Sequence, residues 1–229
     1  MTPVIVVVIP AFNEENAIGE VLKEIPANVV SEIVVVDNNS EDDTADAASK
    51  NGATVLFENR QGYGYACLKG IGYFEKMDIK PDIIVFLDAD HSDYPEELPS
   101  IVKPILENDC DLVIGSRKLG VREKGSMTPQ QVFGNWLATS LIKIFYGIRF
   151  TDLGPFRAIK FDKLLQLQMA DKTYGWTVEM QVKAAKMKMK CCEIPVNYRH
   201  RIGFSKVSGT LTGSMKAGFK ILFTIFRNI

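Results

Sequence analysis

The sequence lacks several features that would place a protein in a class at once. No apolar run approaches the roughly 20 residues that a membrane-spanning helix needs. The apolar start at residues 4–9 ends at Pro10 with no basic segment before it, so we expect neither a signal peptide nor a membrane crossing in this chain. The cysteines form no C-x-x-C pair and have no histidine at ligand spacing; they are Cys67, Cys110, Cys191 and Cys192. A zinc site and a disulfide framework are disfavoured, and we expect reduced thiols in a cytoplasmic protein.

The sequence also lacks an excess of charge of either sign. It has 27 Lys and Arg against 28 Asp and Glu, so nothing in the overall charge suggests nucleic-acid binding. Apolar residues make up 46% and charged residues 24%, which indicates a globular chain with a sizeable core. The exception is residues 199–227, which contain basic residues and no acid: Arg199, Arg201, Lys206, Lys216, Lys220 and Arg227. That stretch favours a phosphate group or an anionic membrane surface, although a solvated face has the same composition.

Two common nucleotide-binding motifs are missing or incomplete. No P-loop pattern with its lysine occurs, which argues against a P-loop NTPase. Residues 60–67 (RQGYGYAC) nearly match the dinucleotide fingerprint G-x-G-x-x-G, but Cys67 replaces the third glycine and the segment follows the third predicted strand. A Rossmann dehydrogenase is therefore disfavoured. Gly62 and Gly64 still permit a close backbone approach at a helix N-terminus, where a phosphate binds favourably.

The sequence does contain a regular alternation of strand and helix patterns. Short β-branched runs predict buried parallel strands at residues 4–9, 33–36, 54–57, 83–87 and 112–114. Helical patterns lie between them at residues 14–24, 42–50, 65–76 and 95–107, with Asn13 as the candidate N-cap of the first. After Arg117 we expect an apolar helix, a helix around residues 176–188, a strand near residues 193–198 and a final helix. This order predicts a doubly wound, mostly parallel α/β sheet with the active site at the carboxyl ends of its strands.

The sharpest chemical signal is Asp88-Ala89-Asp90, directly after the fourth predicted strand. Two carboxylates at this spacing converge on one hard cation if the backbone bends there, and Mg²⁺ or Mn²⁺ bound in this way keeps positions open for a diphosphate. Such a cation would neutralise the leaving diphosphate as a sugar bond breaks. The simpler interpretation is a polar strand end in which Asp90 caps the next helix, because D-x-D alone is common. The position after the fourth strand, with Asp93 nearby, favours the metal.

Two further carboxylates have both a chemical and a structural interpretation. Asp37 begins an acid-rich, turn-forming segment after the second predicted strand. It could accept a hydrogen bond from a nucleobase or a ribose, or simply form an Asx turn. Glu179 lies in the first turn of a predicted helix. It could act as a general base or bind an acceptor, or only complement the helix dipole.

Several segments in order carry a resemblance to a known family. They are IPAFNEE from residue 9, VVDNNSEDDT from 35, RQGYGYA from 60, DADHSDYPEELP from 88, GSR from 115, DLGPFRAI from 152 and NYRHRIGFSK from 197. Together they resemble an inverting family 2 glycosyltransferase of the GT-A fold, and in particular the dolichyl- and polyprenyl-phosphate sugar synthases. The resemblance implies a catalytic domain over residues 1–206, with a nucleotide-binding half at about 1–117 and an acceptor half at about 118–206. An amphipathic helix at 207–229 would follow.

The resemblance also implies roles for individual residues. The donor nucleotide would be bound by Pro10, Ala11, Asn13, Glu14, Asp37, Gly64, Asp88 and Ala89, and the metal by Asp88 and Asp90. The acceptor and its phosphate would be bound by Arg117, Arg157, Arg201, Ser205 and Lys206, and Asp152 falls in an acceptor-side segment. Asp152 and, from its position in the predicted helix alone, Glu179 are the candidates for a further catalytic carboxylate. Mannosyl synthases of this type commonly have a glutamine near the metal. Here Ser92 and Asp93 stand in that region, which leaves the donor sugar and the third metal ligand open.

The expected reaction is transfer of a hexose from a UDP- or GDP-sugar to a polyprenyl or dolichyl phosphate during cell-envelope glycan biosynthesis. A phosphate acceptor is already anionic and needs little help from a base, whereas a hydroxyl acceptor would need Glu179 or Asp152. The alternative is a soluble acceptor, such as a saccharide or a small phosphorylated metabolite. A non-catalytic sugar-nucleotide-binding subunit is disfavoured because Asp88 and Asp90 are both present.

The end of the chain supports a lipid acceptor. From Leu211 the apolar residues recur at helical spacing, with lysines elsewhere on the turn: Met215, Phe219, Leu222, Phe223 and Phe226. This pattern predicts an amphipathic helix that lies in a membrane interface, although a core helix whose lysines reach into water has the same pattern. We expect a peripheral protein at the cytoplasmic face of the membrane, with a membrane protein or a second copy as a further partner.

Overall fold

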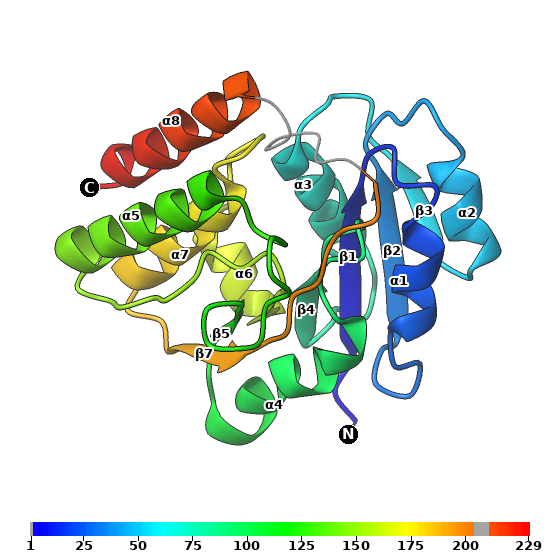
Figure 1. Ribbon diagram of the computed structural model, residues 1–229. Coiled ribbons are helices and arrows are strands. Elements are labelled where there is room, and N and C mark those ends of the chain that lie inside the picture. Colours follow the sequence, from blue (N-terminus) through cyan, green and yellow to red (C-terminus); the bar gives the residue numbers. More distant parts are fainter. Residues whose placement is uncertain (1, 204–210) are drawn as a thin grey trace.

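The computed structural model describes residues 2–203 and 211–229 and shows a mostly parallel sheet between two layers of helices (Figure 1). Within these residues the strand order is β3-β2-β1-β4-β6-β5-β7. Strand β6 runs antiparallel to β4 and β5, and the other neighbouring pairs are parallel. The strands are β1 Ile5–Ala11, β2 Glu32–Asp37, β3 Thr54–Phe57, β4 Ile83–Phe86, β5 Leu112–Ser116, β6 Arg157–Lys160 and β7 Cys191–Pro195. The predicted α/β class is confirmed.

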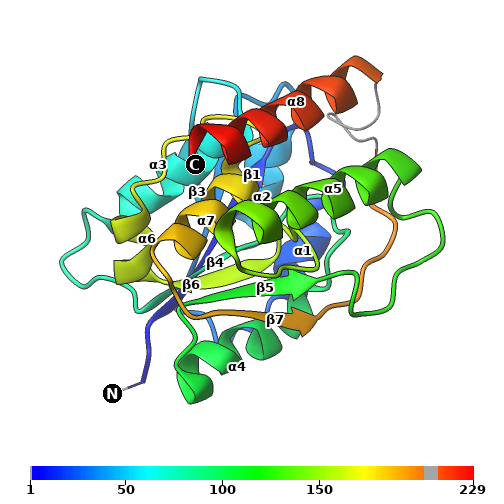
Figure 2. The same cartoon turned by 90° about the vertical axis from the view of Figure 1, so that its left-hand side faces the viewer.

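The helices cover both faces of the sheet, as Figure 2 shows from the side. One face is packed by α1 Ile18–Glu24, α2 Thr44–Lys50 and α4 Leu98–Asn108, the last of these directly after the short 3₁₀ helix η1 Pro95–Glu97. The other face is packed by α3 Tyr63–Phe74, α5 Pro129–Tyr146, α6 Phe161–Leu167, α7 Trp176–Lys186 and α8 Leu211–Arg227. Strand β1 is buried along its whole length because both faces are covered.

The first helix begins later than the sequence predicts. Helix α1 starts at Ile18 and its N-cap is Ala17, which has no side-chain capping bond. Asn13 is therefore not the cap. It adopts a φ of 53°, and its Oδ1 accepts a hydrogen bond from the backbone of Glu41 at 2.8 Å. The local pattern assigned the Asn13 side chain to the start of the helix, whereas in the structure it binds the loop between β2 and α2.

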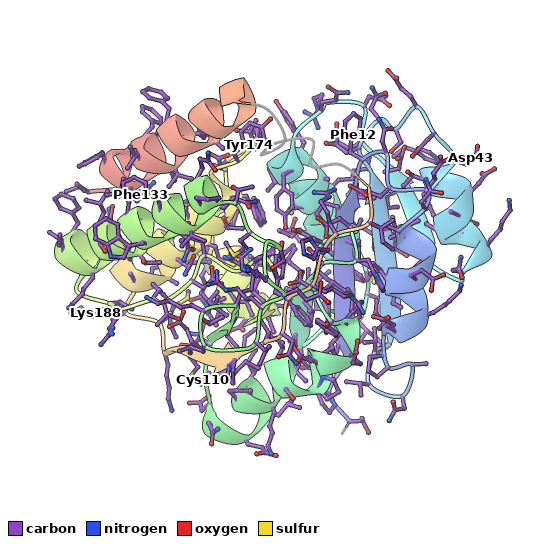
Figure 3. All side chains as sticks on the ribbon, viewed as in Figure 1. Phe12, Asp43, Cys110, Phe133, Tyr174 and Lys188 are labelled. Atoms are coloured by element: carbon purple, nitrogen blue, oxygen red, sulfur yellow. A yellow bond between two sulfur atoms is a disulfide. The ribbon has the colours of Figure 1, made fainter. Side chains whose placement is uncertain are left out.

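The expectation of reduced thiols without a disulfide is wrong in one respect. Cys110 and Cys192 form a disulfide with a Cα–Cα distance of 6.2 Å, within the usual range for such bonds. Parallel pairing of β5 with β7 places Cys192 opposite Val113, a few residues from Cys110, which Figure 3 labels. The bonded residues are 82 positions apart in the sequence, so only the sheet pairing brings them together. Cys67 and Cys191 are free thiols.

Helix α8 packs against α5 and α7 on one face and exposes large apolar side chains on the other. Ile225 and Thr224 are buried, and the Tyr146 hydroxyl donates to the Ile225 carbonyl at 2.6 Å. Phe219 and Phe226 remain 73% and 51% exposed. One side of the helix therefore joins the core, as the core-helix interpretation predicts, and the other side exposes aromatic residues. The membrane-interface helix stays a prediction. Among the described helices, none has the length and apolarity to cross a membrane.

Candidate active site

The carboxyl ends of three neighbouring parallel strands bring the predicted donor-side residues together. The registers of β1 with β2 and β4 set Ala11 beside Asp37 and place the end of β4 next to β1. Pro10 and Ala11 are buried within β1 itself and shape the floor of this edge. Phe12 and Asp43, labelled in Figure 3, mark the same end of the sheet. Topology alone therefore gathers side chains from three separate segments at one edge.

The chain bends sharply after β4, and this bend presents Asp88 and Asp90. Asp88 Oδ1 accepts a hydrogen bond from the Tyr63 hydroxyl at 3.0 Å. Asp90 Oδ1 accepts from the backbone and the hydroxyl of Ser92, and His91 between them has a φ of 64°. Ala89 is buried beneath the turn. The backbone thus makes the turn that convergence of the two carboxylates requires.

Acidic groups crowd this turn and perturb one another. Burial raises the pKa of Asp88 to about 7, and the Asp90 carboxylate adds to the shift. Burial also raises the pKa of Asp93 well above its ordinary value, with Asp88 the next cause. Neither carboxylate oxygen of Asp93 has a hydrogen-bond partner among the described residues. A cation at this turn would relieve the repulsion, and oxygen ligands suit Mg²⁺ or Mn²⁺.

The residues at the turn fit a divalent cation as a pair of ligands. Within the part of the chain that the structure describes, no three Asp, Glu, His or Cys side chains converge at metal-binding geometry. The candidate protein ligands are therefore Asp88 and Asp90, which leave the remaining positions to a diphosphate and water. A third carboxylate, Asp93, lies near enough that the charges of Asp88 and Asp90 help to raise its own pKa.

A cation of the protein already occupies this acidic edge. Arg201, in the segment after β7, pairs with Asp90 Oδ2 at 3.0 Å and with Glu14 Oε1 at 2.7 Å. Glu14 is buried after β1, and its backbone N–H donates to the Thr44 hydroxyl at 2.8 Å. The structure therefore places Arg201 beside Glu14 and Asp90, which were predicted for the donor and the metal, although Arg201 itself was predicted for the acceptor. Ser205 and Lys206 lie outside the described residues.

Asp37 and its neighbour Asn38 organise the β2 end of the site. Asp37 is buried, and its Oδ1 has no partner among the described residues, so this oxygen can accept a ligand N–H or O–H. Asn38 donates to the carbonyls of Glu58 and Arg60 and accepts from the Gly62 backbone at 2.7 Å. Asn38 thereby fixes the loop before α3 against β2. The sequence analysis missed this role, although the Asn pair in DNNS was a signal for it.

Gly64 lies against the backbone of the protein's own chain. A Cβ atom at Gly64 would overlap the backbone carbonyl of Asp171, and one at Gly62 would overlap that of Lys172. The Lys172 carbonyl also accepts from the backbone of Tyr65 at 3.2 Å, in the first turn of α3. The glycines therefore let the loop before α7 approach the helix N-terminus. The backbone of Asp171 therefore occupies the space beside Gly64, and a nucleotide contact at Gly64 stays a prediction.

Arg117 and Asp152 form a buried ion pair on the acceptor side. Arg117 Nε and Nη2 bind the two oxygens of Asp152 at 2.8 and 2.7 Å, and the Arg117 backbone N–H adds a third bond at 2.8 Å. Burial favours the neutral acid, but the charge and hydrogen bonds of Arg117 outweigh it and lower the pKa of Asp152. Asp152 is thus a weak base in this state. Its carboxylate holds the Arg117 guanidinium in one orientation.

Arg157 is buried in the interior of the protein. Its guanidinium is fully buried and donates to the carbonyls of Leu153 and Thr177 at 2.7 and 2.9 Å, and to that of Gly154. Burial lowers its pKa to about 10. Arg157 lies on β6, in the interior of the sheet, and in this structure its guanidinium binds the protein's own carbonyls. Its role as a phosphate ligand stays a prediction.

Glu179 is also used by the scaffold. Its carboxylate accepts from the backbones of Ala170 and Asp171 at 3.0 and 2.7 Å and pairs with Lys183 at 2.8 Å. These bonds hold the loop before α7, the same loop that packs on Gly64. The Glu179 carboxylate thus binds the protein's own donors in this structure, and its role as a general base stays a prediction. Tyr63, whose hydroxyl donates a hydrogen bond to Asp88 in the acidic turn, is a site residue that the sequence analysis missed.

The fold and the acidic turn place the protein among glycosyltransferases of the GT-A fold. The model of glycosyl transferase family 2 matches residues 6–168, so the chain belongs to glycosyltransferase family 2 and is an enzyme of that family. An uncharacterized glycosyltransferase of Mycobacterium tuberculosis is 35% identical over 216 residues, which cover 93% of this chain and 94% of the relative.

Two further proteins are similar over most of the chain. The undecaprenyl-phosphate mannosyltransferase of Micrococcus luteus is 28% identical, with 91% of this chain and 89% of the relative covered. The crystal structure of glucosyl-3-phosphoglycerate synthase from Mycobacterium tuberculosis, in complex with Mn²⁺, UDP-glucose and phosphoglyceric acid, matches with a TM-score of 0.77 at 22% identity. That match covers 99% of this chain and 79% of the solved one, and it shows a shared fold.

Proposed function

We propose that the protein transfers a sugar from a nucleoside diphosphate sugar to a phosphate-bearing acceptor, with inversion at the anomeric carbon. The observation that carries this proposal is the acidic turn after β4, where Asp88 and Asp90 lie beside Arg201 at the edge of the sheet. Asp37, at the end of β2, has an acceptor oxygen without a partner among the described residues and would supply a contact for the nucleoside. The structural neighbour bound to UDP-glucose supports the same donor class.

The proposed cofactor is Mg²⁺ or Mn²⁺, held by Asp88 and Asp90. Structures of the glucosyl-3-phosphoglycerate synthase contain Mn²⁺ or Mg²⁺ together with UDP, which supports this choice. The cation would supply charge neutralisation for the departing diphosphate. Arg201 would add a second positive group on the same side. Tyr63 holds Asp88 in place through its hydroxyl.

The chemistry of the transfer suits an anionic acceptor. An oxygen of the acceptor phosphate attacks the anomeric carbon from the face opposite the diphosphate, and the bond from that carbon to the diphosphate oxygen breaks with its electron pair. Such an oxygen needs no base. The state of Asp152 agrees with this requirement, because both of its oxygens are bound to Arg117. A hydroxyl acceptor would instead need Asp152 to separate from Arg117.

A lipid is one source of that phosphate, and the surface beside the site supports it. Helices α5 and α8 contain no Asp or Glu and expose large apolar side chains: Val132, Phe133, Trp136, Phe219, Phe223 and Phe226. They lie side by side in both ribbon views, and Phe133 is labelled on α5 in Figure 3. Asn135 of α5 binds the backbone of Leu153, next to Asp152. This aromatic, acid-free face suits an anionic membrane surface and opens toward the acceptor side.

A small soluble phosphate is the second source. The solved neighbour carries phosphoglyceric acid, a water-soluble acceptor, and has the same fold over 99% of this chain. The curated mannosyltransferase relative is instead named for a polyprenyl phosphate. The two sources share a phosphate and differ in whether the apolar face is needed.

One experiment separates these possibilities. Purified protein is incubated with UDP- and GDP-sugars and Mn²⁺, with either undecaprenyl phosphate in vesicles or 3-phosphoglycerate in buffer. Transfer to the lipid that falls in the double variant Phe133→Ser, Phe219→Ser would support the membrane acceptor. Transfer to 3-phosphoglycerate that is unchanged in this variant would support the soluble acceptor. No binding of any nucleotide sugar would contradict the proposed function itself.

A further inference from the structure

Arg201 is bound within the candidate metal site rather than beside it. Its Nη1 lies 3.0 Å from Asp90 Oδ2 and its Nη2 lies 2.7 Å from Glu14 Oε1. These carboxylates follow β4 and β1, while Arg201 follows β7, so three distant segments meet at this cation. Glu14 and Asp90 are only 8% and 9% exposed. A buried acidic pair of this kind requires a nearby positive charge, and here the protein supplies it.

Both oxygens of Asp90 are already engaged. Oδ1 accepts from the backbone N–H of Ser92 at 3.0 Å and from its hydroxyl, and Oδ2 faces the Arg201 guanidinium. A divalent cation on Oδ2 would be close to the guanidinium, and two positive charges at that distance repel strongly in a partly buried site. A metal ion can therefore bind Asp90 well only when the Arg201 side chain moves away.

The backbone that carries Arg201 is anchored independently of this ion pair. The backbone N–H of Arg199 donates to the Ser92 carbonyl at 2.9 Å, and that of Ile202 donates to the Asp90 carbonyl at 3.0 Å. Arg199 Nε also binds the His91 carbonyl at 2.7 Å. The guanidinium can therefore rotate away while its backbone stays over the turn. Release of Arg201 needs a change of rotamer and no refolding of the segment.

The observed position leaves Arg201 incompletely satisfied. Its Nε is buried and has no acceptor among the described residues. An unmet buried donor is costly, and phosphate oxygens are strong acceptors for a guanidinium. A diphosphate bound at the turn would offer Arg201 a new anion at the moment when the metal takes Asp90.

We propose that Arg201 is a built-in counter-ion that makes metal binding conditional on the nucleoside diphosphate. The inference rests on the proposed metal site. A metal ion that binds alone must displace the Arg201 guanidinium from Asp90, and the guanidinium is then left without an anion. When a diphosphate binds together with the metal, its phosphate oxygens replace Asp90 as the partner of Arg201. The metal and the nucleotide therefore strengthen each other's binding, and Arg201 carries that coupling. Its effect is to keep the site closed to free divalent cations until the donor arrives.

The test is Mn²⁺ binding, followed by the electron paramagnetic resonance signal of free Mn²⁺, with and without UDP or GDP. We expect Arg201→Ala to bind Mn²⁺ alone at least about tenfold more tightly than the unmodified protein. We also expect the nucleotide to improve Mn²⁺ affinity less in this variant. Arg201→Lys keeps the positive charge on a shorter side chain, and its Mn²⁺ affinity should lie between those of Arg201→Ala and the unmodified protein. This variant also shows whether a folding defect explains the result for Arg201→Ala.

Lys160→Ala is the matched control. Lys160 also bridges two carboxylates, those of Asp109 and Asp111, and its side chain is 25% exposed, the same fraction as Arg201. It lies opposite Ile83, at the far end of β4 from the turn. Its removal should leave Mn²⁺ affinity unchanged.

Three results would count against these ideas, and they are distinguishable. Mn²⁺ affinity of Arg201→Ala equal to or weaker than that of the unmodified protein would overturn the inference and leave the metal site intact. An equal gain in Lys160→Ala would also overturn it, because the effect would then be general loss of positive charge. Failure of the unmodified protein to bind Mn²⁺ even with nucleotide would contradict the proposed metal site itself.

Discussion

The proposed donor side and the proposed acceptor side of the molecule use their charged residues differently. At the ends of β1, β2 and β4, Asp37 keeps an unfilled acceptor oxygen and Asp88 a pKa raised to about 7. In the second half of the chain, Arg157 and Glu179 have their polar atoms filled by backbone groups of the protein. A polar atom without a hydrogen-bond partner at a strand end indicates a ligand site. A polar atom whose hydrogen bonds all go to the protein's own groups indicates a structural role.

The cause of this difference lies in the topology. Parallel strands end together at one edge, which gathers the polar residues that follow them. The β6 strand instead runs antiparallel between β4 and β5, so its residues enter the interior of the sheet. A charged side chain there must find partners within the protein, because burial without partners is too costly. The four predictions below test this contrast, from the largest effect to the smallest.

The largest effect should come from the donor edge. Asp90→Ala removes a carboxylate from the turn, and we expect sugar transfer to fall about a thousandfold, a barrier increase of roughly 4 kcal/mol. The chelator EDTA should have a similar effect on the unmodified protein. The measurement is initial rate with a saturating nucleotide sugar. Asp109→Ala, which removes an exposed carboxylate paired with Lys160, should keep the full rate. Equal rates in Asp90→Ala and the unmodified protein would remove the turn from the active site.

The second effect should be one of stability. Arg157→Met keeps the apolar stem but leaves buried carbonyls without donors, and we expect the free energy of unfolding to fall by about 3 kcal/mol. Urea unfolding followed by circular dichroism measures this change. Residual folded protein should keep its KM for the acceptor. A raised acceptor KM with unchanged stability would instead restore Arg157 as a phosphate ligand.

The third effect compares two glycines of the same helix. A methyl group at Gly64 would overlap the Asp171 carbonyl, whereas one at Gly72 would meet no atom within 4 Å. We expect Gly64→Ala to destabilise the protein by about 2 kcal/mol and Gly72→Ala to be neutral or slightly stabilising. Thermal unfolding of both variants gives the answer. A stable Gly64→Ala protein with a raised KM for the donor would show that Gly64 faces the nucleotide after all.

The smallest effect should come from Glu179. Glu179→Gln removes the negative charge that pairs with Lys183 and strengthens the bonds from the two loop amides, and we expect a loss of about 1 kcal/mol in the free energy of unfolding. We expect kcat to change less than about twofold, since the side chain binds the scaffold. Chemical unfolding and kcat across pH 4–8 are the measurements. Loss of the fall in kcat on the acidic side of this range, with intact stability, would indicate that Glu179 is the base.

Much of the fold and one edge of the site could be predicted from local sequence. The runs of β-branched residues at β1, β2 and β4 are apolar because both faces of a parallel sheet are covered. The local pattern therefore predicts that these strands are buried in a parallel sheet. Once those strands are predicted, the residues after them must lie at one edge. Asp37 and Asp88 could therefore be placed together without any structure.

Other assignments depended on residues far apart in the sequence. Glu193 accepts hydrogen bonds from the backbones of Thr151 and Asp152, and Arg117 holds the Asp152 side chain. No local sequence pattern predicts that Arg117, Asp152 and Glu193 lie in contact with one another's segments. The disulfide between Cys110 and Cys192 is a similar case, because its two ends become neighbours only through the pairing of β5 with β7.

The sequence by itself determined the α/β class, the strand ends that carry the acidic turn and the membership in family 2. These follow from local periodicity and from short motifs whose residues are neighbours in the chain. Only the tertiary structure decided that Arg157 and Glu179 serve the scaffold, that Gly64 admits a loop, and that Arg201 neutralises Asp90 and Glu14. The physical reason is that a buried charge is defined by its partners, and those partners are chosen by the packing of distant segments.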